Sequence, residues 1–257
     1  MIARLEKLFH TILALEQPGA LRVWFTSNAF HAPCFRLNSA LKRHQPRFGT
    51  ILDVGANTGQ FAVAAALHFP DARIYSFEPL PEVYRELCRN ISKRRNLRAF
   101  NCALGSTGGR LAFNRNAYSR LSSALAIASG NRYPRYRERN TSAIEVAVER
   151  LDDFARRLDL VPPVLLKMDV QGMEQAVLMG ASRTLERIDF LLYETALVPL
   201  YENQPLFDEM HRFTVDLGYR LLAPMLLNKS RSGTIIEMDV LYQRASLGSR
   251  ASRTCWV

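Results

Sequence analysis

The segment ILDVGANTGQF, residues 51–61, places glycines and polar side chains directly after a short apolar run. Gly55 permits a tight turn and lets a ligand approach the backbone, and Gly59 allows close packing where a helix would begin. Asp53 and Asn57 add a carboxylate and a side-chain amide beside exposed backbone N–H groups. Together these groups suit a ligand that carries both an ammonium and a carboxylate, as an amino-acid moiety does.

This loop departs from both common phosphate-binding patterns. No Lys-Ser or Lys-Thr pair follows GANTGQF, which excludes a GxxxxGK[ST] loop, and Asn57 stands where GxGxxG has its second glycine. A nicotinamide-dependent oxidoreductase on a related fold stays open as an alternative, which a test of NAD binding would decide.

A second polar group follows the next apolar run, YSFEP. Glu78 lies 19 residues beyond Gly59, and an acid at the end of a second strand can accept two hydrogen bonds from a ribose diol. Pro79 then turns the chain away. Taken alone, Glu78 also fits an acid at a helix N-terminus, which the helix dipole favours, but the loop and the acid together indicate a ligand site.

The elements that must position these groups alternate between strand and helix from about residue 50 onward. Apolar runs such as TILDV, ARIYSF, PVLLKMDV and IDFLLYE read as strands, and helical periods follow them in GQFAVAAALHF, PEVYRELCRNI and MEQAVLMGASRTLER. YRLLAPMLL and GTIIEMDVLYQ near the end predict a closing antiparallel pair. We therefore expect an α/β, doubly wound, mainly parallel sheet, with ligands bound at the carboxyl ends of its strands.

Composition favours one large soluble domain. The chain has 257 residues, of which 48% are hydrophobic and 23% charged. We expect a helical extension over residues 1–45, the main domain over 46–245 and a basic tail over 246–257. The four cysteines are scattered, so we expect neither a disulfide framework nor a zinc site. No apolar run is long enough for a membrane span, and we expect a cytoplasmic location.

The formal net charge of +10 is unusual and is compatible with a nucleic acid, an anionic membrane surface or an acidic small substrate. Basic residues cluster over 85–98, over 131–140 and after residue 243. Solvated surface explains such clusters most simply, and a non-catalytic, polyanion-binding protein is the competing hypothesis.

Five segments resemble, in order, the motifs of the FkbM-like family of S-adenosylmethionine-dependent methyltransferases: ILDVGANTGQF, FEPLPEVYRELCRNI, NCALGSTGG, VERLDDF and LLKMDVQGMEQAVLMGA. The resemblance covers roughly residues 48–195. It implies a class I methyltransferase (Rossmann-like) fold, S-adenosyl-L-methionine as the cofactor, and O-methylation of a hydroxyl of a sugar, glycan, glycolipid or polyketide-type metabolite. No nucleic-acid substrate is expected, because no Asn-Pro-Pro-Tyr or Asp-Pro-Pro-Tyr block is present.

The same resemblance assigns roles to individual residues. Glu78, with Pro79 beside it, would bind the ribose hydroxyls. The family commonly has Glu where this chain has Gln171, so no carboxylate function is expected at that position. The methionine part of the cofactor would be held by Asp53, Gly55, Asn57 and Gly59, and the adenine would lie by Asn101 and Ala103.

Methyl transfer to a hydroxyl needs in-line alignment and usually a base that takes the proton. Asp169, at a strand end facing the same crevice, is the first catalytic candidate, and Glu194 is the second. Lys167 lies on the same sheet face and would lower the pKa of the Asp169 carboxyl or orient it. The alternatives are that Asp169 caps the helix beginning near Met173 and that Lys167 forms only an ion pair. Two acids do not establish a metal site, and none is predicted.

Two loops should determine which acceptor molecule binds. Residues 114–140 are too long and polar for a simple connection, and residues 194–205 form a second candidate lid. Within the first, Ser122 and Ser123 would approach the cofactor or the acceptor. Its tyrosines, Tyr118, Tyr133 and Tyr136, with the neighbouring arginines, would stack on a sugar or hold an anionic group such as a phosphate or uronate. A disordered cationic loop is the alternative. The N-terminal segment leaves a homo-oligomer and a peripheral membrane contact open.

Overall fold

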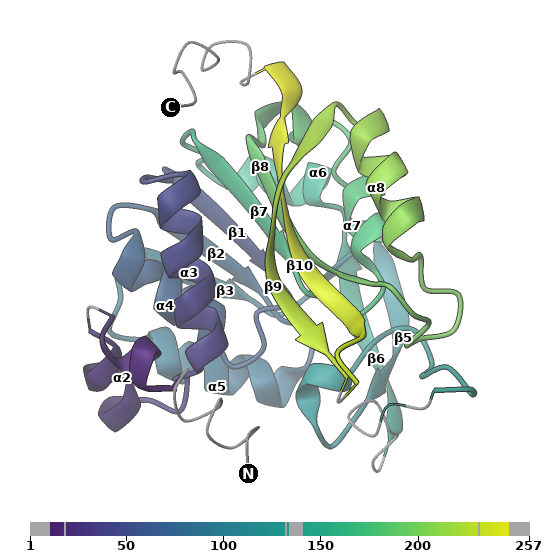
Figure 1. Cartoon of the computed structure of the whole chain (residues 1–257), viewed down its shortest axis with the longest axis horizontal. Helices are drawn as coiled ribbons and strands as arrows, with labels where there is room; N and C mark the ends of the chain where they lie inside the picture. Colours follow the sequence, from purple (N-terminus) through teal and green to yellow (C-terminus); the bar gives the residue numbers. More distant parts are fainter. Residues whose placement is uncertain (1–10, 18, 132, 134–140, 231, 247–257) are drawn as a thin grey trace.

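A central sheet of seven strands organises the molecule, here described from a computed structural model (Figure 1). The structure describes residues 11–17, 19–131, 133, 141–230 and 232–246. In their order across the sheet the strands are β3 (Leu97–Phe100), β2 (Arg73–Phe77), β1 (Thr50–Val54), β7 (Val164–Met168), β8 (Phe190–Ala196), β10 (Ile235–Arg244) and β9 (Tyr219–Lys229).

The central strands are buried on both faces, as their nearly continuous apolar sequences predict. Every residue of β1 and of β7 is buried, and the pairs from β3 through β8 are parallel. β10 runs antiparallel to both β8 and β9. The predicted α/β, mainly parallel sheet with a closing antiparallel pair is therefore confirmed.

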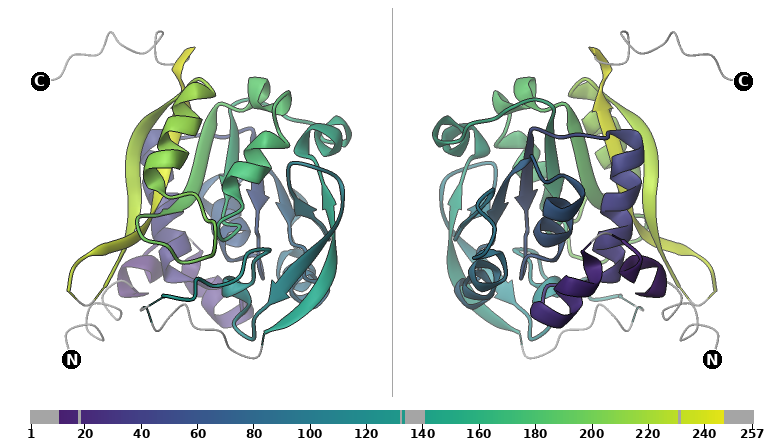
Figure 2. Two further views of the ribbon diagram at one scale, coloured as in Figure 1. Left: turned by 90° about the vertical axis from the view of Figure 1, so that its right-hand side faces the viewer. Right: turned by 90° about the vertical axis from the view of Figure 1, so that its left-hand side faces the viewer.

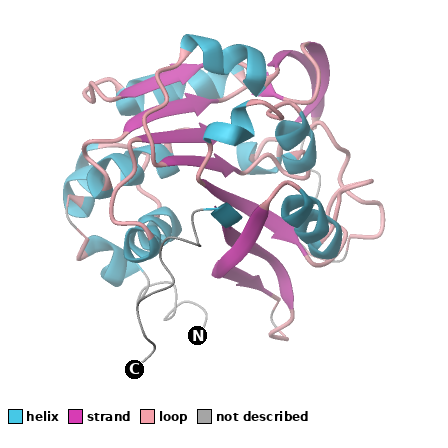
Figure 3. Ribbon diagram, turned by 90° about the horizontal axis from the view of Figure 1, so that it is seen from above, coloured by secondary structure: helices cyan, strands magenta, loops and turns pink. Residues whose placement is uncertain are grey.

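Helices cover both faces of the sheet, as Figures 2 and 3 show. Successive side chains of β1 point to opposite faces of the sheet, so Ile51 packs into one apolar cluster and Leu52 into the other. Each cluster lies under one layer of helices. The first layer consists of α2 (Ala20–Thr26), α3 (Ala32–His44), α4 (Gln60–His68) and α5 (Pro81–Ile91), and the second of α6 (Leu151–Phe154), α7 (Glu174–Met179) and α8 (Phe207–Asp216).

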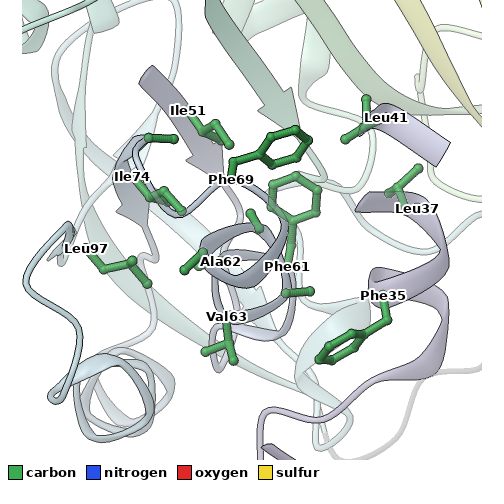
Figure 4. Close-up of a cluster of buried hydrophobic side chains, with 14 of the residues drawn as sticks. Phe35, Leu37, Leu41, Ile51, Phe61, Ala62, Val63, Phe69, Ile74 and Leu97 are labelled. Atoms are coloured by element: carbon green, nitrogen blue, oxygen red, sulfur yellow. The ribbon is translucent and has the colours of Figure 1, made fainter. Parts of the chain in front are cut away.

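The helix after the glycine-rich loop is enclosed by other elements. α4 packs between the sheet and α3, with Phe61 and Val63 of α4 and Phe35 of α3 in one cluster with Ile51 and Ile74 of the sheet (Figure 4). The alanines of α4 allow α3 to approach closely. The amino-terminal helices thus share the core with the elements that carry the glycine-rich loop.

A second, three-stranded sheet was not predicted. It has the order β4 (Ala103–Leu104), β6 (Ser142–Glu149) and β5 (Gly109–Arg115), with β4 parallel and β5 antiparallel to β6. Leu104 of this sheet is buried, and Leu111 and Phe113 are half-buried. These side chains form one wall of the site described below.

The long helix expected from MEQAVLMGASRTLER is wrong, because α7 ends at Met179 and a separate 3-10 turn, η4 (Thr184–Arg187), follows. A Cβ at Gly180 would lie 1.9 Å from the backbone oxygen of Gly105, so the chain turns where it meets the second sheet. Asp152 Oδ1 accepts hydrogen bonds from the backbone N–H groups of Arg183 and Thr184, which caps the new turn. Among the described residues, none of the helices has the length and apolarity that crossing a bilayer requires.

Candidate active site

The glycine-rich loop brings the ends of two parallel strands together. Gly55 has a φ of 73°, and a Cβ there would lie 2.0 Å from the backbone oxygen of Asp169. Only glycine fits this contact. The backbone N–H of Asp169 in turn donates to the Val54 oxygen, so the loop after β1 and the end of β7 form one surface.

Glu78, at the end of β2, is tied to the same loop. Its Oε2 accepts a hydrogen bond from the Asn57 backbone N–H and its Oε1 accepts one from the Leu80 N–H, both at 2.9 Å. Burial raises the pKa of this carboxyl to about 7, although these two hydrogen bonds oppose the rise. Each oxygen keeps a lone pair for a ligand hydroxyl.

A pocket of about 80 Å³, called the inner pocket, opens in front of Glu78. Polar groups of Asn57 and Glu78 lie among mainly apolar wall residues. That wall comes from three places, the loop after β2, the second sheet and the loop after β7: Pro79, Leu80, Cys102, Ala103, Leu104, Leu111, Phe113 and Val170. Such a lining suits a flat, apolar ring system linked to hydroxyl groups.

Two predicted cofactor residues support the inner pocket without lining it. Asn101 Nδ2 donates to the backbone oxygens of Glu78 and Pro79, at 2.9 and 3.0 Å, and so fixes the turn after β2. Gly59 begins α4 with a φ of 91°, and a Cβ there would lie 2.8 Å from the Leu87 side chain. Direct contact of either residue with a cofactor stays a prediction.

Asp53 and Lys167 form a buried ion pair beneath the loop. Asp53 Oδ1 lies 2.9 Å from Lys167 Nζ, and Asp53 is fully buried. Although burial alone would lower the pKa of Lys167, the carboxylates of Asp53 and Asp169 raise it, so the side chain stays a cation. Lys167 Nζ also donates to the Gly55 backbone oxygen at 3.3 Å. Asp53 lines neither the inner pocket nor the larger space described next, and its direct contact with the cofactor stays a prediction.

A larger space of about 700 Å³, called the outer groove, adjoins the inner pocket. Its walls include the start of α3 and the β9–β10 pair. Lys167 lines it as well. Five residues line both spaces, and these are Gly55, Asn57, Arg120, Asp169 and Gln171. Four carboxylates line the outer groove, and these are Asp169, Glu194, Glu237 and Asp239.

Gln171 joins the two predicted catalytic acids. Its Nε2 donates to Asp169 Oδ1 at 2.8 Å and to Glu194 Oε2 at 3.0 Å, while its Oε1 accepts from the Tyr201 hydroxyl at 2.7 Å. Gln171 has a φ of 54°, in the left-handed region. The structure therefore brings Asp169 and Glu194 together at the groove, with an amide where a carboxylate would repel both.

Among the described residues, no side chain caps the start of α7. Glu174, its first residue, instead holds the loop that precedes the helix. Its two carboxylate oxygens accept from the backbone N–H groups of Val170 and Gly172, each at 3.0 Å. Burial raises the pKa of Glu174 to about 7. The helix-capping interpretation of Asp169 is therefore wrong, and its carboxylate faces both spaces instead.

The predicted lid loop crosses the glycine-rich loop. Asn57 Nδ2 donates to Ser119 Oγ at 3.0 Å, and Ser123 Oγ donates to the Gln171 backbone oxygen at 2.7 Å. Ser122 lines the inner pocket and Tyr118 lines the outer groove. Two other predicted residues differ: Tyr133 packs in an apolar cluster with Leu200, and Tyr136 lies outside the described residues.

Two groove residues, Asp239 and His31, were missed at the sequence level, and Arg120 was included there only as one of the arginines near Tyr118. Asp239 on β10 stands in register with Glu194 on β8, and its pKa is raised to about 7 by burial and by Asp169. Arg120 Nη1 donates to His31 Nε2 at 2.8 Å, and its guanidinium lies 5.9 Å from the Tyr118 ring centroid. Of the two missed residues, only Asp239 had a signal in the sequence, because it lies in a predicted strand where alternate residues share a face.

His211 lines neither the inner pocket nor the outer groove. Within the described ranges, no group of three or more His, Cys, Asp or Glu side chains is arranged to hold a metal ion. His211 Nδ1 lies 2.8 Å from the Tyr242 hydroxyl and its ring stacks on Phe207, so it is packed against β10 and α8.

Part of the chain matches a known protein family. Residues 53–221, more than half of the chain, match the methyltransferase FkbM domain. The chain belongs to the FkbM methyltransferase family. FkbM membership and the observed strand order together give a class I methyltransferase fold, and S-adenosylmethionine is the cofactor of this methyltransferase.

Named relatives agree with the family. The 2-O-methyltransferase NoeI of Sinorhizobium fredii is 29% identical over 172 residues, which are 65% of this chain and 70% of the relative. Methyltransferase 1 of Beauveria bassiana is 29% identical over 142 residues, 51% of this chain, and the match spans 57% of that relative's length. Among solved structures, fibrillarin of Aeropyrum pernix with bound S-adenosyl-L-methionine has a TM-score of 0.45 at 18% identity, over 81% of this chain and 76% of that chain.

The inner pocket offers acceptor oxygens and an apolar wall, which suit the adenosyl part of the cofactor. Glu78 presents carboxylate oxygens, as a ribose diol needs, and the apolar wall with Ala103 and Leu104 suits an adenine. Gly55 leaves its backbone open to both spaces, since a side chain there would collide with Asp169. We therefore assign the adenosyl part to the inner pocket. Which single residues contact it stays a prediction.

Proposed function

We propose that the protein is an O-methyltransferase that methylates a hydroxyl of a sugar, glycan, glycolipid or polyketide-type metabolite held in the outer groove. The observation that carries this proposal is the junction of the two spaces, where Gly55, Asp169 and Gln171 line both. An acceptor in the groove would meet the cofactor there. The name of one relative, 2-O-methyltransferase NoeI, supports transfer to oxygen.

Asp169 is the proposed proton acceptor. Bound S-adenosylmethionine supplies an electrophilic methyl group on a sulfonium. Gln171 donates to Asp169 Oδ1, which leaves Oδ2 for the acceptor hydroxyl, and the same amide nitrogen holds Glu194. Asp169 would orient this hydroxyl and take its proton as the C–O bond forms. Glu194 would bind a neighbouring hydroxyl.

Lys167 is proposed as a positioning residue rather than a base. Its amine is held as a cation by Asp53 and donates to the Gly55 backbone oxygen. It thereby fixes the loop at the junction and places positive charge near the oxygen that loses its proton.

The proposed reaction is tested by incubating the protein with methyl-labelled S-adenosylmethionine and a panel of methyl glycosides and polyketide alcohols. We expect label in an O-methyl group of at least one class, and Asp169→Asn should lower kcat by about 100-fold or more while S-adenosylhomocysteine still binds. Transfer to nitrogen or carbon only, or full activity of Asp169→Asn, would contradict the proposal.

A further inference from the structure

We propose that Arg120 binds the carboxylate of the methionine part of the cofactor, and that His31 positions Arg120 from the amino-terminal extension. This inference rests on the proposed placement of the cofactor at the junction of the inner pocket and the outer groove. It assigns a binding residue outside the five motif segments and a role to residues that precede the matched domain.

The location of Arg120 is the first argument. It lies in a single 3-10 turn, η1 (Ser119–Leu121), whose Ser119 hydroxyl accepts a hydrogen bond from Asn57 Nδ2 at 3.0 Å. This bond holds the turn against the glycine-rich loop. Arg120 lines both spaces together with Gly55 and Asn57. The amino-acid end of the cofactor must lie along this loop, so a carboxylate there would be within reach of the guanidinium.

Charge balance is the second argument. Lys167 at the same junction is neutralised by Asp53, and Arg115 on the same segment pairs with Glu82. In the part of the chain that the structure describes, no carboxylate forms an ion pair with Arg120, which is half-buried. A guanidinium that is partly removed from water is stabilised when an anion accompanies it. The methionine carboxylate would supply that anion in a charge-assisted hydrogen bond.

The contacts of Arg120 leave donors available for a ligand. Its Nη1 donates to the neutral acceptor His31 Nε2 at 2.8 Å, and the guanidinium packs against the Tyr118 ring. A guanidinium has five N–H donors in a fixed plane, so these contacts orient the group without exhausting it. His31 precedes α3, and its Nδ1 lies 3.2 Å from Cys34 Sγ, which holds the imidazole in place.

The test compares two ligands that differ in the amino-acid part. S-adenosylhomocysteine carries the carboxylate, whereas 5′-methylthioadenosine keeps the adenosine and sulfur but lacks the amino-acid group. Both are titrated by calorimetry, the weaker one in competition, into the full chain and into Arg120→Gln, His31→Ala and His31→Gln. Arg115→Gln serves as the matched control, because it removes an arginine from the same segment that lines neither space.

We expect Arg120→Gln to weaken S-adenosylhomocysteine binding by about 10- to 100-fold and to change methylthioadenosine binding by less than about twofold. His31→Ala should reduce the preference for S-adenosylhomocysteine over methylthioadenosine by a smaller factor. His31→Gln, which keeps an acceptor, should restore that preference. Arg115→Gln should leave both affinities unchanged. Equal losses of affinity for the two ligands would show that Arg120 has a merely structural role. No loss of affinity for either ligand would assign Arg120 to acceptor binding. Each of these results would overturn the proposal. Failure of the unsubstituted protein to bind S-adenosylhomocysteine would instead contradict the cofactor site itself.

Discussion

Glu78 links cofactor affinity to pH at the level of a single carboxyl. Its pKa is raised to about 7 by burial, and the ribose hydroxyls would donate to its ionised form. Binding therefore favours the ionised carboxylate and lowers its pKa, so affinity should be full above pH 7 and fall as the pH drops below it.

The expected result is a fall of up to about tenfold per pH unit between pH 7 and pH 5.5 in the affinity for S-adenosylhomocysteine, with proton release on binding. Calorimetry in buffers of different ionisation enthalpy measures both quantities. The control is Glu78→Gln, which should bind weakly and without this pH dependence. An affinity of the unsubstituted protein that is constant over this range would contradict the ribose assignment.

The Asp53–Lys167 pair sets a second expectation at the residue scale. Asp53→Asn would leave a buried lysine without its counter-charge, and breaking such a pair destabilises a protein by about 3 to 5 kcal/mol. Urea unfolding should show this loss, and the double variant Asp53→Asn with Lys167→Met should lose less than the sum of the single changes. Glu145→Gln is the control, because the Arg110–Glu145 pair is exposed and its loss should stay within about 1 kcal/mol. Equal effects of Asp53→Asn and Glu145→Gln would contradict a structural role for the buried pair.

Only part of the residue-level site was predictable. Gly55, Asn57 and Glu78 carry local signals, because a turn after a strand constrains which residue types can follow it. The link from Gln171 to Glu194 and the link from Arg120 to His31 join residues 23 and 89 positions apart. No local pattern specifies such pairs, and whether Asp169 caps α7 or faces the site depended on side-chain direction.

The glycine-rich loop matters at the scale of elements, because it sets β1 against β7. Gly55→Ala would place a methyl group 2.0 Å from the Asp169 oxygen in a residue with a φ of 73°. We expect a loss of at least about 2 kcal/mol in unfolding free energy and a loss of S-adenosylhomocysteine binding. Gly130→Ala is the control, since a Cβ there meets nothing within 4 Å. Comparable denaturation midpoints and affinities for the two variants would contradict this function of the loop.

Element types were predicted better than their limits. The alternation of apolar runs and helical periods gave the succession of the main sheet's strands along the chain and the closing pair, because both periods reflect burial directly. The second sheet was not expected, since β4 has two residues and β5 is half exposed. α7 is shorter than predicted because Gly180 meets Gly105 in the loop after β4, a tertiary contact that helical periodicity does not contain.

Ligand binding should stabilise the molecule as a whole. A cofactor that binds only the folded state at 100 times its Kd adds about 2.7 kcal/mol, which for a chain of this length is a rise in Tm of about 5 to 10 °C. Thermal unfolding with S-adenosylhomocysteine should show this shift, and NAD at the same concentration should not. A shift with NAD alone would revive the oxidoreductase hypothesis that the glycine pattern disfavours.

The arrangement of two adjoining spaces is the central claim at the scale of the molecule, and a crystal structure of the complex with S-adenosylhomocysteine tests it most directly. We predict that the adenosine fills the inner pocket with its ribose hydroxyls on the Glu78 carboxylate, and that the sulfur points to the junction beside Asp169. A ligand bound elsewhere, or one whose ribose lies away from Glu78 and whose sulfur faces away from the outer groove, would contradict the account.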